Sequence, residues 1–171
     1  MSSRLLAALS LGCAVLSLGC AALGLGCADP EREAAAGYVE VMQPIFVENM
    51  ALTRQFVEVA TEVKKGTAEP RAIAGRFEQA LIPGAVALRD RVIEVQPANA
   101  ELATIHQGLA EAWTGRVDAW SGLHAAWDAS DLDAFDAATR RNLQVKTAEE
   151  RYIGQVNAWL AGHELSLRQF P

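Results

Sequence analysis

Four side chains that could line a site recur at intervals of seven residues: His106, Trp113, Trp120 and Trp127. Seven residues turn an α-helix by about 700°, so each side chain lies only about 20° around the helix from the previous one. Indoles along one seam can form the floor of a ligand pocket or of a protein interface, and they can equally fill the core of a helical bundle. The spacing therefore predicts either a core seam, which is the commoner use of such indoles, or a ligand or interface stripe.

A second pair of residues, Met42 and His163, could bind a haem iron. Met42 lies early in the first long segment with helical periodicity, and His163 lies near the end of the last one. This placement resembles the cytochrome b562 type of four-helix bundle, in which a Met of the first helix and a His of the last bind haem. The resemblance makes Met42 and His163 candidate haem ligands. Otherwise the sequence indicates no cofactor, and it has no Cys-x-x-Cys-His motif for covalent haem.

The other polar residues form no complete catalytic or metal-binding motif. His106 and His124 are 18 residues apart, which separates them by about 27 Å along a helix and prevents them from sharing an ion. The sequence has neither the Glu-x-x-His pair of di-iron bundles nor a His-Glu-x-x-His motif. No serine lies in a Gly-x-Ser-x-Gly elbow, and an acidic pair such as Glu149-Glu150 is typical of a solvated helix face. We therefore predict no enzyme activity and no metal site.

The first 26 residues have the pattern of a secretory signal. Arg4 precedes an uncharged apolar stretch, and charged residues begin abruptly after Cys27. A short basic start, an apolar stretch and small residues at its end are typical of a signal peptide. The stretch is also long enough for a single membrane-spanning anchor, which is the alternative.

Three Gly-Cys pairs in this stretch resemble the lipobox of bacterial lipoproteins. In that family a peptidase cuts before a cysteine that carries diacylglycerol, so the resemblance implies lipidation of Cys27, with Cys20 as the second choice. It also implies an anchor in the outer membrane rather than the inner membrane, because Ala28 and not Asp follows the cysteine. The body would then lie in the periplasm or at the cell surface. Ordinary cleavage after Ala28 also fits, with small residues at Gly26 and Ala28.

The body is acidic and has no cysteine. The whole chain has 15 Lys and Arg against 21 Asp and Glu, and Arg4 is the one charged residue of the first 28. Nucleic acid binding needs concentrated positive charge, which this body lacks. We therefore expect the membrane and an envelope protein as partners and exclude nucleic acid.

Apolar residues recur at three- and four-residue intervals over four long segments. The predicted helices are about 31–65, 68–96, 98–128 and 131–168. Gly66 and Pro97 mark two of the boundaries, and Ser130 is expected to cap the start of the fourth helix. Pro44 and Pro83 lie inside two segments and predict kinks there.

The sequence thus predicts an all-α protein. Helices of similar length joined by short connections pack antiparallel, which gives an up-down-up-down four-helix bundle after the signal peptide. The predicted parts are a signal peptide at 1–26, a lipidated cysteine and short tether at 27–36, and the bundle at 37–171.

Two functions fit this organisation. The first is a membrane-tethered lipoprotein that acts as a non-catalytic interaction or assembly module, which requires an apolar surface patch. The second is a bundle that binds haem or a small apolar molecule, which requires a cavity beside the tryptophan seam.

Overall fold

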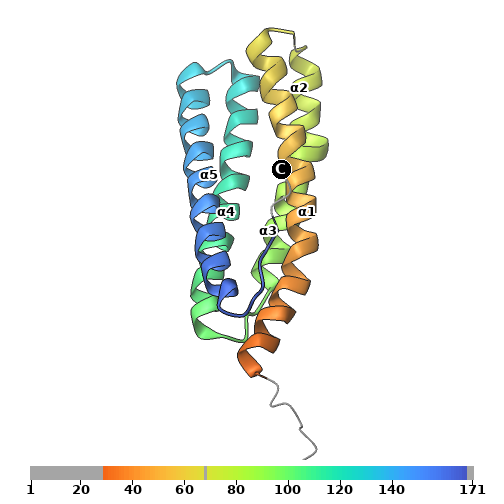
Figure 1. Ribbon diagram of the computed structural model, residues 1–171. Coiled ribbons are helices and arrows are strands. Elements are labelled where there is room, and N and C mark those ends of the chain that lie inside the picture. The colour runs from red at the N-terminus through yellow and green to blue at the C-terminus, as the bar shows by residue number, and fades with distance from the viewer. Residues whose placement is uncertain (1–28, 68, 169–171) are drawn as a thin grey trace, which may run out of the picture.

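The computed structural model describes residues 29–67 and 69–168, and these residues form helices and short connections without any β-strand (Figure 1). The elements in chain order are α1 (Pro30–Lys65), α2 (Pro70–Arg76), the π-helical turn η1 (Phe77–Leu81), α3 (Ile82–Glu94), α4 (Ala100–Ala129) and α5 (Leu132–Ala161). The predicted all-α class is confirmed.

The helices lie side by side along one long axis (Figure 1). The α1–α2 and α4–α5 connections lie at the upper end of this view, and the α3–α4 connection lies at the lower end. α2, η1 and α3 follow one another as a single rod. The most extensive packing is between α4 and α5, and α3 packs against both α4 and α1. No helix of the described residues is long and apolar enough to cross a membrane.

α1 begins earlier than the bundle boundary predicted from the sequence. Asp29 caps the helix by accepting a hydrogen bond from the backbone N–H of Glu31 at 3.0 Å, and Pro30 occupies the first turn. Residues 30–36 are therefore helical, in agreement with the helix predicted at about 31–65, although they were also assigned to the tether. The helix continues through Pro44 without a break and ends at Gly66, whose positive φ of 65° suits a glycine.

The helical rod formed by α2, η1 and α3 accommodates Pro83 next to the π-helical turn η1. The core side chains Ile73, Phe77, Leu81 and Ala85 follow one another at steps of four residues, and each such step drifts by about 40° on a regular α-helix. The wider turn η1 takes up this drift and keeps the four side chains on the core face. The helical backbone therefore continues past Pro83, and the π-helical turn lies just before the proline where the sequence predicted a kink.

α5 differs from its predicted bounds at both ends. Its N-cap is Asp131, which accepts a hydrogen bond from Ala134 N–H at 3.0 Å, whereas Ser130 ends α4 with a left-handed φ of 53°. The predicted cap at Ser130 was wrong because that residue is needed to close the preceding helix. α5 ends at Ala161 and not at 168, because Glu164 adopts a left-handed φ of 61° and Leu165 N–H bonds back to Leu160 C=O.

The residues after α5 form a tail that turns back along the bundle toward its middle (Figure 1). Asn157 accepts from the backbone N–H of Leu167 at 2.8 Å and donates to its C=O at 3.3 Å. Gln43 accepts from the N–H of Arg168 at 3.0 Å and donates to its C=O at 3.2 Å. The Leu167 side chain is buried, so the tail ties α5 to α1.

Candidate ligand-binding site

The tryptophan seam of α4 divides into a buried part and a partly buried end. His106, Trp113 and Trp120 lie in the core, with 5%, 1% and 2% of their surface exposed. Trp127 is only partly buried, near the upper end of the molecule, where it packs against Phe135 of α5. The structure therefore places the first three residues among core side chains and the fourth beside open space.

His106 belongs to a buried hydrogen-bond chain whose protons can be assigned. Its Nε2 lies 2.8 Å from the carbonyl oxygen of Val92, which can only accept, so Nε2 carries the proton. Nδ1 therefore accepts from the Tyr38 hydroxyl at 2.8 Å, and Tyr38 in turn accepts from the Tyr152 hydroxyl at 2.7 Å. Burial lowers the pKa of His106 and raises the pKa of both tyrosines. The chain is neutral, and its role is to join α1, α3, α4 and α5.

We expect this neutral histidine to make stability depend on pH. The unfolded chain binds a proton at His106 near pH 6.5, and the folded chain binds it only at lower pH. The free energy of unfolding should therefore fall as the pH drops below 6.5, by at most about 1.4 kcal/mol per pH unit. Urea unfolding between pH 7.5 and 5.5 should show that the free energy of unfolding falls less steeply for His106→Gln than for the parent protein. Equal slopes would contradict this, since His124 and His163 are present in both proteins.

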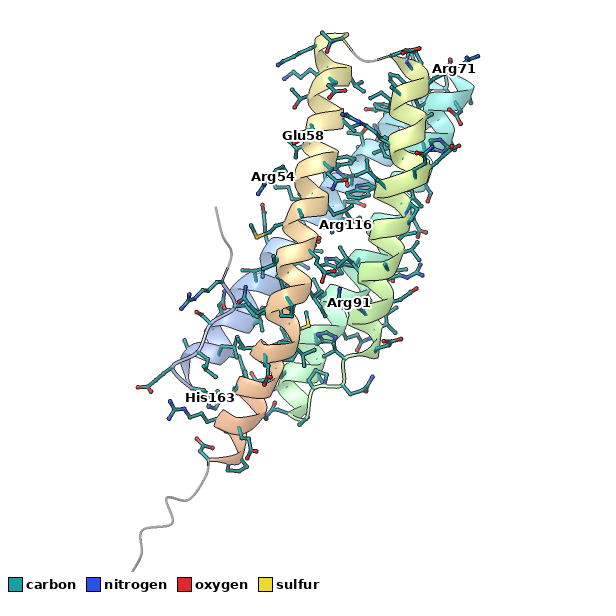
Figure 2. All side chains as sticks on the ribbon, turned by 90° about the vertical axis from the view of Figure 1, so that its right-hand side faces the viewer. Arg54, Glu58, Arg71, Arg91, Arg116 and His163 are labelled. Atoms are coloured by element: carbon teal, nitrogen blue, oxygen red, sulfur yellow. The ribbon has the colours of Figure 1, made fainter. Side chains whose placement is uncertain are left out.

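Arg116 lies between the two buried indoles of α4. Its guanidinium carbon is 5.3 Å from the ring centre of Trp113 and 5.5 Å from that of Trp120. The guanidinium donates to Asn49 of α1 and to Glu149 of α5, and the Trp113 indole N–H donates to the same carboxylate. Figure 2 shows Arg116 inside the bundle, halfway along its length. Burial lowers the pKa of Arg116 and raises that of Glu149, and the opposite charge of the partner counters both shifts.

Sequence reasoning missed this ion pair, although one signal was present. Arg116 is three residues after Trp113 and four before Trp120, so all three share one helix face. Glu149 gave no such signal. We interpreted it as part of a solvated acidic pair, and that interpretation was wrong because the register of α5 points this carboxylate at Arg116.

Two adjoining hollows open between α1 and the α4–α5 pair. The polar pocket, of about 640 Å³, is lined by Arg116, Glu149 and Thr53 among others. The Thr53 hydroxyl has no hydrogen-bond partner within the described part of the chain. The apolar pocket, of about 380 Å³, lies nearer the upper end, and Phe56 and Asn142 line both.

The walls of the apolar pocket come from five elements, α1, α2, η1, α4 and α5, and are almost entirely aliphatic or aromatic. The principal side chains are Phe56, Val63, Ile73, Phe77, Leu123 and Trp127. Lys64 carries the only charge among the described residues that line it, and Thr139 and Asn142 are the only other polar ones. The pocket thus combines a large apolar wall with one cation.

The two candidate haem ligands are not brought together. Met42 is completely buried in the core. His163 packs on the ring of Trp159, 4.7 Å between centroids, and lies at the lower end of the molecule (Figure 2). The next residue, Glu164, pairs with Arg32 at 3.6 Å, and Met42 is ten residues, or about 15 Å, further along α1.

The lipidation candidates Cys27 and Cys20 lie outside the described residues. Comparisons with protein families, with curated proteins and with solved structures find nothing that matches this chain. The case for a function therefore depends on the geometry of the pockets and on the sequence.

Proposed function

We propose that this chain is a lipid-anchored, non-catalytic binding module of the cell envelope. Its body would be an antiparallel up-down-up-down four-helix bundle, an arrangement supported by helix connections that alternate between the two ends of the molecule (Figure 1). Its ligand would be a small apolar molecule with an anionic end, bound in the apolar pocket.

The lining of the apolar pocket carries this proposal. Small-molecule sites are usually concave, have volumes of about 300–1,000 Å³, and combine apolar walls with a few polar groups. The apolar pocket has about 380 Å³ and aromatic side chains on several sides. Lys64 would pair with a carboxylate or sulfonate while the apolar part of the ligand replaces water against Phe56 and Trp127.

The polar groups beside the pocket support binding rather than catalysis. Arg116 and Glu149 are paired with each other and are held by Asn49 and Trp113. The ion pair therefore forms part of the wall of the polar pocket, which adjoins the proposed binding site.

Binding can be tested with dodecanoate, which should displace the anionic fluorophore anilinonaphthalene sulfonate from the folded protein. Ala60→Trp should fill the apolar pocket, which Ala60 lines, and weaken binding by at least about tenfold, because the apolar part of the ligand loses its wall. Gln55→Trp, an exposed site on the same helix, is the matched control and should bind normally. Lys64→Gln should weaken the binding of dodecanoate but not the binding of dodecanol. Equal dodecanoate binding by the parent and all variants would refute binding in the apolar pocket. Binding of a protein partner, instead of dodecanoate, would favour the interaction module.

The anchor has its own test. Cys27→Ala should move the protein from the membrane fraction to the soluble fraction, because each buried lipid methylene contributes about 0.8 kcal/mol to anchoring. Cys20→Ala is the control and should leave the protein on the outer membrane. Mass spectrometry of the mature N-terminus should find diacylglycerol on Cys27. A Cys27→Ala protein that stays in the membrane would indicate a spanning anchor or lipid on Cys20.

A further inference from the structure

Three side chains with metal-binding atoms converge where η1 meets α4. Glu78 comes from η1, and His124 and Asp128 lie one turn apart on α4. His124 Nε2 is 3.5 Å from a Glu78 carboxylate oxygen and 3.4 Å from an Asp128 carboxylate oxygen. The ligand atoms of all three residues lie within 4.8 Å of one another. The cluster therefore offers one nitrogen and two oxygens around a common point.

The nitrogen at this point has no hydrogen bond. His124 Nε2 is shielded from solvent and has no hydrogen-bond partner within residues 29–67 and 69–168. An unpaired buried polar atom costs free energy and requires an explanation. The two carboxylates do not provide one by hydrogen bonding, since both lie beyond the usual range of about 2.7–3.2 Å.

The two nitrogen–oxygen separations match those around a tetrahedral ion. Zinc binds histidine nitrogen and carboxylate oxygen at about 2.0–2.2 Å, which places neighbouring ligand atoms of a tetrahedron about 3.4 Å apart. Both nitrogen–oxygen separations agree with this value. The two carboxylates are more than half exposed, so an ion can enter from solvent and keep water as a fourth ligand.

We propose that Glu78, His124 and Asp128 form a binding site for a divalent transition-metal ion of the zinc type. Imidazole with two carboxylates suits such ions, and the two negative charges favour a cation. The bound ion would fix η1 against α4. Because Phe77 and Leu123, the neighbours of two ligands, line the apolar pocket, the ion would also stiffen one wall of that pocket. The site does not depend on the proposed ligand of that pocket.

This site could not be recognised from the sequence, because its ligands come from two separate helical segments, η1 and α4. His124 and Asp128 are four residues apart and share a face of one helix, but two ligands are too few to predict a metal. Glu78 is 46 residues before His124 in the chain. Only the packing of η1 on α4 adds it to the pair.

The test is calorimetric titration of zinc chloride into the metal-free full chain. Its cysteine thiols, Cys13, Cys20 and Cys27, are alkylated first, because cysteine thiolates are zinc ligands as well. We expect one ion per chain and a higher melting temperature with zinc present. Cobalt in place of zinc should give the strong visible absorption of a tetrahedral site.

Variants of the three ligand residues distinguish zinc binding at this site from incidental zinc binding elsewhere on the chain. His124→Gln, Glu78→Gln and Asp128→Asn should each weaken zinc by at least about tenfold, because each removes a ligand. His163→Gln and Asp136→Asn are the matched controls and should bind zinc like the parent. Glu78 and Asp128 are exposed, so their variants should remain folded, which circular dichroism checks. A chain that binds no zinc, or zinc binding that the three variants leave unchanged, would overturn the proposal.

Discussion

Replacing Arg116 by methionine is expected to lower the free energy of unfolding by about 3–5 kcal/mol. Methionine fills similar space, but it leaves the Glu149 carboxylate mostly buried without its counter-charge. It also removes the donor to Asn49 and the cation that lies over both indoles. Glu149→Gln should be destabilising for the same reason, because it leaves the guanidinium without its anion.

Equilibrium unfolding in urea with two further variants tests whether the loss comes from the unpaired charge. The double variant Arg116→Met with Glu149→Leu should recover most of the lost stability, since an apolar pair needs no counter-charge. Arg140→Met breaks the exposed pair with Asp136 and should change stability by less than about 1 kcal/mol. A loss of that small size for Arg116→Met would show that water reaches the guanidinium.

The helices were predictable because their signals are local. Gly66 ends α1 as expected, since a glycine accepts a left-handed φ without strain. Most of the periodic apolar residues of each segment became the core faces, although Val41 of the first segment is exposed. Local patterns of this kind need no knowledge of the neighbouring helices.

The misplaced boundaries have a different cause. Ser130 and Glu164 both adopt the left-handed conformation that glycine usually takes at a helix end. Neither residue type predicts that conformation, and Ser130 more commonly starts a helix. The end of α5 at Ala161 did carry one local signal, because its C-cap is Gly162, but the left-handed residue that turns the chain back is Glu164.

The contacts that form the sites are separated in the sequence. Gln43 meets Arg168 across 125 residues, and Arg116 meets Asn49 across 67. Such pairs depend on how the helices are rotated against one another, which no single segment specifies. The sequence could therefore predict that α4 carries a functional or core seam, but not which polar residues complete it.

The second large effect on stability is expected in the tryptophan seam of α4. Trp120→Ala should lower the free energy of unfolding by about 3–5 kcal/mol, because the ring is buried and its loss leaves a cavity. The indole is stacked on Phe56 with ring centres 4.7 Å apart, and its N–H donates to Asn142 at 2.8 Å. Removing it therefore also leaves the Asn142 acceptor without its donor.

Trp127→Ala is the matched control, since it removes the same side chain seven residues later on the same seam. Trp127 is only partly buried and lines the apolar pocket, so its loss should cost clearly less stability. Its larger effect should be on dodecanoate binding, which Trp120→Ala should leave mostly intact wherever that variant stays folded. Urea unfolding and ligand titration of the two variants would separate a core indole from a ligand-contacting one. Equal losses of stability, with binding unaffected by Trp127→Ala, would mean that all three indoles of the seam serve the core alone.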